Sequence, residues 1–372
     1  MNISQPDLFA GIQGLNLHSI PKIDLHRHIA GSVRPATAWE LSKRTPEGAS
    51  ASSLQDFCQS LMWKKPAENL DEFITRPWSI INKILNNPAA LRRITYEVVE
   101  DAHCDNVAYV ELRLVALRGP SFPVESVIRS ACQGLQQAAA DFPATTARLI
   151  LGLDRSVVGH WKPESIRRHT EKILVAAEPY RQQWIVGFDL SGREDSAPVA
   201  AFKEYFKLVK QAGYRVTVHA GEVGPASEVL DAILICGADR IGHGLSAATS
   251  HETLQMLKDR NISLEICPSS NLLTGSVATL VQHPLTRLIS RSVKFSINTD
   301  DPTVCNTTSS AEFESLMKGN IINEDAMWGI LNDSIDTSFA DEQTKSKLRE
   351  RLNTARKSVP GGPDADSDVK TE

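Results

Sequence analysis

The sequence predicts an α/β protein in which eight parallel strands close into a (β/α)8 TIM barrel. Short runs rich in Val, Ile, Leu and Phe alternate with longer amphipathic stretches, as expected of a parallel sheet built from strand–helix–strand units. Eight such runs occur, which favours a closed barrel over an open sheet. No Gly-x-Gly-x-x-Gly turn follows the first run, and this weakens the alternative of a dinucleotide-binding fold.

Each predicted strand is a short apolar run followed by a helix-like segment. The strands are expected at residues 22–26, 107–113, 148–153, 185–190, 215–219, 240–243, 263–267 and 294–300. About 80 residues separate the first two strands. One crossover needs far fewer, so we expect a helical insertion there, with one helix over 71–85. In a barrel, an insertion after a strand lies over the active-site face, where it can act as a lid.

The chain length of 372 residues fits one barrel domain with insertions. We expect an N-terminal extension at 1–20, a single (β/α)8 domain at 21–358 and a disordered tail at 359–372. Amphipathic patterning over 311–355 is consistent with the last barrel helices. After Val359 the tail continues with Pro-Gly-Gly-Pro and with mostly polar and charged residues, a composition typical of disorder.

The composition is that of a folded globular protein, with 41% hydrophobic and 23% charged residues. The formal net charge is -5 and the chain has no dense Lys/Arg tract, which argues against nucleic acid or an anionic membrane and favours a small-molecule partner. We find neither a secretory signal nor a run of the roughly 20 apolar residues that a membrane span needs. Six scattered cysteines without a Cys-x-x-Cys pair indicate reduced thiols in a cytoplasmic protein. The oligomeric state is left open.

Candidate chemistry lies at the ends of four predicted strands. The first strand runs into His26-Arg27-His28, whose two imidazoles point to the same side because strand side chains alternate. The other three motifs are His219-Ala-Gly-Glu222, Gly-His243-Gly and Asp300-Asp301. Each motif alone also fits an ordinary role, such as a hydrogen-bonded core histidine, a tight turn or a helix-capping carboxylate. Together they occupy the C-terminal ends of barrel strands, where active sites of this fold are built.

Three imidazoles and one carboxylate predict a mononuclear zinc site, because this donor set suits a borderline-soft ion that keeps one position open for water. The predicted ligands are His26, His28, His219 and Asp300. Glu222, His243 and Asp301 would lie beside that water, able to donate, accept and orient protons.

The other histidines lie in loops or helix-like segments away from these strand ends, where surface positions are expected. They are His18, His103, His160, His169, His251 and His283. The fourth strand offers no lysine to bridge a second metal, which disfavours a binuclear centre.

Six stretches of the sequence resemble the adenosine deaminase family of the amidohydrolase superfamily, in the family's order and from about Pro21 to Pro302. They are PKIDLHRHIAGS, GFDLSGRE, VTVHAGEVG, RIGHG, LEICPSSN and NTDDP. The combination is highly specific, although no single stretch is. The resemblance implies one zinc ion per chain, held by the four ligands named above. It also implies hydrolytic deamination of a 6-aminopurine to the 6-oxopurine, with release of ammonia or an amine.

The resemblance also implies a role for each of the other site residues. Glu222 would protonate the ring nitrogen N1, while His243 would assist deprotonation of the water and Asp301 would hydrogen-bond and orient it. Gly192, in the Leu-Ser-Gly turn after the fourth strand, matches the glycine whose backbone amide meets the purine N3. His28 is expected to contact the substrate as well as the metal.

One position departs from the family pattern. After the second histidine, adenosine-specific members carry an aspartate that reaches the ribose and adenine-specific members carry a glutamate, whereas this chain has Ala30. Ribose recognition must therefore differ, through Ser32 or Arg27 for example, or the substrate must be another aminopurine. Two rival hypotheses stay open: a mononuclear amidohydrolase acting on another heterocycle, and a non-catalytic barrel protein.

Overall fold

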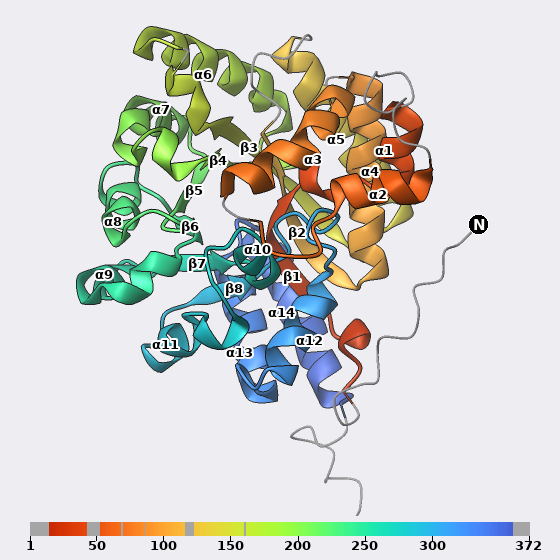
Figure 1. Cartoon of the computed structure of the whole chain (residues 1–372), viewed down its shortest axis with the longest axis vertical. Helices are drawn as coiled ribbons and strands as arrows, with labels where there is room; N and C mark the ends of the chain where they lie inside the picture. Colours follow the sequence, from red (N-terminus) through yellow and green to blue (C-terminus); the bar gives the residue numbers. More distant parts are fainter. Residues whose placement is uncertain are drawn as a thin grey trace, which may run out of the picture.

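The computed structural model describes residues 15–42, 53–67, 70–85, 87–115, 123–159 and 161–359. Eight parallel strands follow one another in chain order around a single sheet. Backbone hydrogen bonds from Asp300 N to His26 O (2.8 Å) and from His28 N to Asp300 O (2.7 Å) join the last strand's end to the first. The sheet is thus a barrel with its helices outside (Figure 1), and the predicted (β/α)8 fold is confirmed.

The strands lie close to their predicted positions. They are β1 (Lys22–His28), β2 (Val107–Leu114), β3 (Thr146–Asp154), β4 (Ile185–Ser191), β5 (Arg215–Ala220), β6 (Arg240–His243), β7 (Ser263–Ile266) and β8 (Phe295–Ile297). The largest difference is β8, which ends at Ile297 and not at Asp300. Asn298 ends the regular pairing, because its side-chain Oδ1 accepts from Leu25 N (2.8 Å) and its Nδ2 donates to Ile266 O (3.2 Å).

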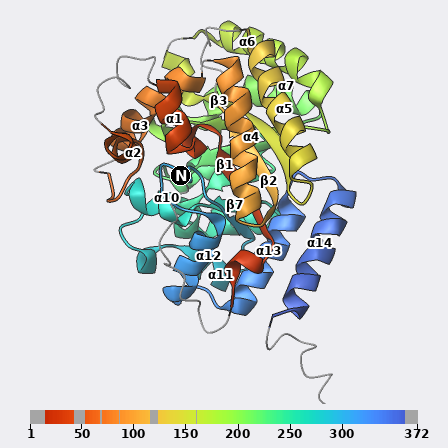
Figure 2. The same cartoon turned by 90° about the vertical axis from the view of Figure 1, so that its right-hand side faces the viewer.

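The predicted insertion after β1 is helical. It contains α1 (Pro35–Ser42), α2 (Leu54–Leu61) and α3 (Leu70–Leu85), which pack against one another (Figure 2), and α4 (Pro88–Cys104), which packs on β2 and α5. The chain between α2 and α3 reaches the barrel mouth, since Trp63 N donates to Val304 O (2.9 Å) after β8 and Ala67 N donates to Leu273 O (2.8 Å) after β7. The insertion therefore lies against the active-site face, as expected.

The remaining helices surround the strands or cover their ends. They are α5 (Val124–Asp141), α6 (Pro163–Ala177), α7 (Lys203–Gln211), α8 (Ala226–Leu234), α9 (His251–Asp259), α10 (Pro268–Leu273), α11 (Leu285–Ser290), α12 (Ser309–Lys318), α13 (Glu324–Thr337) and α14 (Glu342–Lys357). Side-chain caps set several helix starts: Asp341 Oδ1, for example, accepts from Thr344 N (2.8 Å) at the start of α14.

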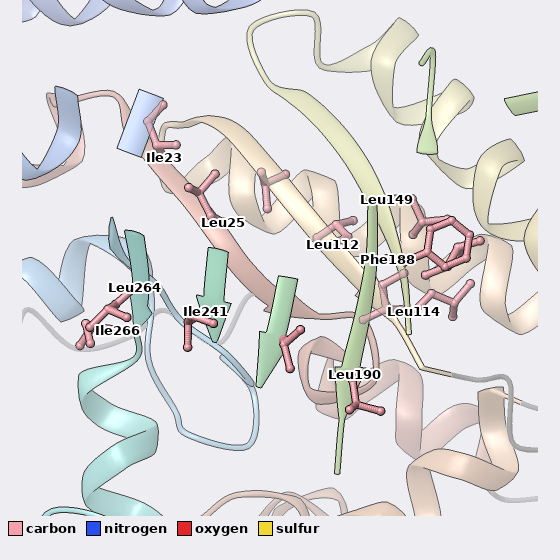
Figure 3. Close-up of a cluster of buried hydrophobic side chains, with 14 of the residues drawn as sticks. Ile23, Leu25, Leu112, Leu114, Leu149, Phe188, Leu190, Ile241, Leu264 and Ile266 are labelled. Carbon is pink, nitrogen blue, oxygen red and sulfur yellow. The ribbon is translucent and has the colours of Figure 1, made fainter. Parts of the chain in front are cut away.

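Strand alternation sorts the core into two environments. Leu112, Leu149, Phe188 and Leu190 belong to the apolar set that the strands direct at the helices (Figure 3). The opposite faces of the same strands carry charged residues into the barrel, Arg113 among them. The barrel interior is therefore held by polar contacts as well as by packing.

Some expectations fall wholly or partly outside the described residues. Of the expected extension at 1–20, the structure describes 15–20, where a short 3₁₀ helix (Leu17–Ser19) precedes β1. All of the expected tail except Val359 lies outside the described residues, as does His160. Among the helices that are described, none is long and apolar enough to cross a membrane. The six cysteines are all described and form no disulfide.

Candidate active site

The four predicted metal ligands meet at the C-terminal mouth of the barrel. Asp300 Oδ1 lies 3.4 Å from His26 Nε2 and 3.4 Å from His28 Nε2. His28 Nε2 lies 3.3 Å from His219 Nε2. Three of the four residues are buried, and His28 is 13% exposed, which leaves its imidazole at the open side of the cluster.

Carboxylates inside the barrel fix the ring orientations of two histidines. His26 Nδ1 donates to Glu265 Oε2 (2.9 Å), and His219 Nδ1 donates to Asp189 Oδ1 (3.1 Å). Each imidazole therefore presents the lone pair of Nε2 to the mouth, the arrangement expected of a metal-binding histidine with a carboxylate behind it.

These orientations fit a cation. His26 Nε2 is buried and has no hydrogen-bond partner among the described residues, although the carboxylate of Asp300 lies next to it. Burial and Arg113 would lower the pKa of His26, but Asp300 and Glu265 outweigh them and raise it, so the surroundings of this nitrogen attract positive charge. Imidazole lone pairs and a carboxylate that converge in this way form a suitable donor set for zinc.

A buried ion network holds the two supporting carboxylates. Arg113 pairs with Asp189 through Nε (3.0 Å) and with Glu265 through Nη2, while Arg240 Nε binds the other oxygen of Glu265 (2.6 Å). Burial would raise the pKa of Glu265, but Arg113 and Arg240 outweigh it and hold this pKa well below its usual range. The carboxylates behind the histidines thus stay ionised and can accept the Nδ1 protons.

Sequence reasoning did not assign Arg113, Asp189 or Glu265 to the site. A signal was present, because each is a charged residue inside a mainly apolar strand, and buried charges occur almost only in pairs or beside metals. Their partners come from different strands and become neighbours only when the barrel closes.

His243 reaches the mouth through an unusual backbone. Its φ is +58°, and Asp300 also has a φ of +58°. Side-chain-bearing residues seldom adopt this left-handed region, and such strain is concentrated at functional sites. The chain turns away from the direction of β6 at His243 and from the direction of β8 at Asp300. Both side chains thereby lie beside the histidines of the proposed metal site.

A relay of side chains fixes the tautomer of His243. Leu285 N donates to His283 Nδ1 (3.3 Å), His283 Nε2 donates to Asn271 Oδ1 (3.3 Å), and Asn271 Nδ2 donates to His243 Nδ1 (3.2 Å). His243 then carries its proton on Nε2, which lies 3.7 Å from Glu222 Oε2. Burial lowers the pKa of His243 well below its usual range, so this imidazole is neutral.

The expected surface position of His283 is therefore wrong. Its side chain is 1% exposed, and burial lowers its pKa to about 4. His18, His103, His169 and His251 do lie away from the strand ends, as expected.

Two carboxyl groups at the mouth favour the protonated form. Burial and the charges of Asp300 and Glu194 raise the pKa of Glu222 to about 8. Burial and the charges of Asp300 and Glu222 raise the pKa of Asp301 well above its usual range. Asp301 packs against Gly31, where a Cβ atom would come within 1.8 Å of its Oδ1, so only glycine fits there. The site thus combines metal donors, a neutral imidazole and two proton-bearing carboxyls.

The loop that carries Glu222 is held by a carboxylate from the neighbouring loop. Glu194, which follows β4, accepts from Glu222 N (3.2 Å), Val223 N (2.9 Å) and Gly224 N. Gly192, also after β4, has a φ of +89° and lies at the same end of the barrel. The structure therefore gathers all the predicted site residues at one mouth.

Ser32 and Arg27 do not replace the carboxylate that is missing at Ala30. Ser32 Oγ donates to His28 O (2.6 Å), and Arg27 Nε binds Asp24 Oδ2 (2.9 Å) and Thr299 Oγ1 (3.1 Å). Both line a separate cavity of about 850 Å³ beside α4 and α12 that none of the predicted site residues lines. That suggestion from the sequence is wrong, because Arg27 alternates with the two histidines and faces the other way.

Known proteins of similar sequence and structure support one family. Residues 21–355 match the sequence model of the adenosine deaminase family. An adenosine deaminase of Clostridium perfringens (strain SM101 / Type A) is 33% identical over 338 residues, which cover 90% of this chain and 98% of that protein. An adenosine deaminase of Shewanella woodyi is 31% identical over the same share of both chains.

Solved structures agree with the sequence matches. The Arabidopsis N6-mAMP deaminase is 28% identical with a TM-score of 0.78, and the match covers 91% of this chain and 99% of that one. A cog1816 amidohydrolase of Burkhoderia ambifaria with bound Zn is 25% identical with a TM-score of 0.76, over 91% and 93% of the two chains. Arabidopsis ADAL complexed with IMP is 27% identical with a TM-score of 0.79, over 92% and 99%. This chain belongs to the adenosine deaminase family.

Proposed function

We propose that the protein is a zinc-dependent deaminase that converts a 6-aminopurine nucleoside, nucleotide or N6-substituted derivative to the 6-oxopurine, with release of ammonia or an amine. The observation that carries this proposal is the meeting of a zinc donor set with a carboxyl whose pKa is raised to about 8, that of Glu222. Membership of the family and the deaminase activity named for its relatives support it.

The proposed metal ligands are His26, His28, His219 and Asp300. When bound, one zinc ion would supply a nucleophile by lowering the pKa of a water molecule from about 15.7 to about 7. All other steps belong to side chains of this chain.

Glu222 acts as the general acid. Because its carboxyl still holds a proton at neutral pH, it donates that proton to N1 while water adds to C6, which keeps negative charge from accumulating on the ring. His243, whose Nε2 carries a proton, assists deprotonation of the water by donating a hydrogen bond to its oxygen. Asp301, which a cation in the cluster would ionise, hydrogen-bonds the water, aims it at C6 and accepts its proton. The C6–nitrogen bond then breaks: the leaving amine takes the proton held by Asp301, and the C6 hydroxyl returns its remaining proton to Glu222 as the 6-oxo group forms.

Binding groups position the purine for this attack. The backbone amide of Gly192 donates to N3, and His28, at the open side of the cluster, contacts the substrate as well as the metal. A small-molecule substrate agrees with the nucleotides bound by ADAL. A cytoplasmic location stays a prediction from the scattered thiols.

A substrate panel tests the proposal. We expect zinc-loaded protein to release ammonia from at least one of adenine, adenosine, 2′-deoxyadenosine and AMP, or methylamine from N6-methyl-AMP. The Arabidopsis relative named for N6-mAMP makes the last compound a necessary member of the panel. Failure on all of them, with turnover of another cyclic amidine, would support the rival amidohydrolase reaction. Absence of all turnover with zinc bound would support a non-catalytic barrel.

A further inference from the structure

The N9 side of the proposed substrate lacks its expected acceptor, because Ala30 replaces an acidic residue and Ser32 and Arg27 are engaged elsewhere. Another carboxylate lies at the mouth, at the end of β3. Asp154 is 4% exposed and is the last residue of that strand. Its position on the strand shows which way its side chain points.

Asp154 faces into the barrel. In the parallel register of β3 and β4, Gly152 pairs with Asp189 and Asp154 pairs with Ser191. Asp189 points inward, since it binds Arg113 and His219. Paired residues of neighbouring strands share a face, and residues two apart on one strand do too. Asp154 therefore points into the mouth, one layer above Asp189.

The Asp154 carboxylate touches the proposed purine-binding turn. A Cβ atom added to Gly192 would lie 2.9 Å from Asp154 Oδ1 and 3.0 Å from its Oδ2. Any side chain at Gly192 would thus collide with this carboxylate, apart from the strain that a φ of +89° imposes. The turn whose glycine amide would meet N3 therefore packs against the Asp154 carboxylate.

The bonding order of a purine determines where its N9 substituent lies. N1 and N3 are separated by C2, and C4 links N3 to N9. If N1 is at Glu222 after β5 and N3 is at Gly192 after β4, the N9 substituent continues around the mouth towards β3, the next strand in the barrel. Asp154 stands at that point, at the end of β3 and against Gly192.

We infer that Asp154 is a specificity residue that accepts a hydrogen bond from a sugar hydroxyl on N9. This inference rests on the proposed function and assigns the substrate a hydroxylated sugar. A purely structural role would instead rest on contacts within the protein, such as the hydrogen bond that Ser156 N donates to Asp154 Oδ1 (2.8 Å).

The variant Asp154→Asn separates the two roles. The asparagine oxygen can still accept from Ser156 N, so this hydrogen bond is kept, while the negative charge of the acceptor is lost. We expect kcat/KM for adenosine to fall about tenfold to a hundredfold, the usual range for a hydrogen bond to a charged group. For 9-methyladenine, which has no sugar, kcat/KM should stay within about twofold, since no bond to Asp154 is lost.

A double-mutant cycle on the substrate tests the contact directly. With wild type, kcat/KM for either 2′-deoxyadenosine or 3′-deoxyadenosine should be lower than for adenosine by about the factor that Asp154→Asn causes with adenosine. For that deoxy compound, Asp154→Asn should lower kcat/KM no further. Asp195→Asn is the matched control, because this carboxylate lies near Gly192 in the loop after β4 but is exposed and pairs with Arg193. It should change none of these values.

The outcomes distinguish this inference from the proposed function. Equal losses on adenosine and 9-methyladenine, or no loss on either, would overturn the role of Asp154 and leave deamination standing. A melting temperature of Asp154→Asn well below that of wild type, with all substrates affected alike, would point to the structural role. No deamination of any of these compounds by zinc-loaded wild type would overturn the proposed function, and the role of Asp154 with it.

Discussion

Replacing Glu222 with glutamine removes a carboxyl that the barrel mouth keeps protonated. The Glu222 side chain is 9% exposed, and its pKa is raised from 4.5 to about 8. Since the folded pKa lies above the unfolded one, the contribution of this group to stability is full below pH 4.5 and is lost as the pH rises through about 8. The neutral amide of Glu222→Gln has no such loss.

The size of the effect follows from the two pKa values. Between these two pKa values, the free energy of unfolding falls by about 1.4 kcal/mol for each unit that the pH rises. At pH 7 the Glu222 carboxyl therefore lowers the free energy of unfolding by about 3 kcal/mol. We expect Glu222→Gln to be more stable than wild type by up to this amount at pH 7, and by almost nothing near pH 4.5. The same variant should lose roughly 100-fold or more in turnover, because the general acid is gone.

Urea unfolding of chelator-treated wild type and variant, at pH values from about 5 to about 8, measures the stability difference. Glu350→Gln, which changes an exposed carboxyl on α14, is the control and should show no pH-dependent difference. Turnover is measured on zinc-loaded protein, with the zinc content of the variant equal to that of wild type. A stability difference that does not change with pH, or a variant with near-normal turnover, would refute the role assigned to Glu222.

Four further changes test the site. His219→Ala should lose most of about one zinc per chain, measured by elemental analysis, whereas two tightly held metals in wild type would contradict a mononuclear site. Glu265→Gln should weaken zinc binding about 10- to 100-fold in chelator competition, since the histidine in front of it loses its orienting carboxylate; unchanged affinity would show that the carboxylate has no such role. Asn271→Ala should lower kcat with unchanged zinc content because His243 loses its fixed tautomer, and a normal kcat would argue against the relay. Ala30→Asp should raise kcat/KM for adenosine relative to the best substrate of the panel, because it adds the acceptor of adenosine-specific members to the one inferred at Asp154; no gain would mean that the sugar contact needs no acid at position 30.

Local patterns in the sequence are enough to predict the barrel and most of the residues at its mouth. Strand positions follow from local alternation of apolar runs and amphipathic stretches, and barrel enzymes place their chemistry at the C-terminal strand ends. His26, His219 and His243 could therefore be located from neighbouring residues alone. The same local patterning indicated the helical insertion, because the spacing between the first two strands is visible in the chain.

The side chains that support these residues, and the point where β8 ends, depend on contacts that exist only in the folded protein. Arg113, Asp189 and Glu265 lie far apart in the sequence and pair only when the closed barrel brings three strands together. His283 is buried because Asn271, from the helix after β7, holds it, and no local pattern encodes that contact. The register of β3 and β4 places Asp154 against Gly192, and this contact cannot be read from the sequence. Pairing between distant segments depends on which elements become neighbours, and local periodicity carries no information about that.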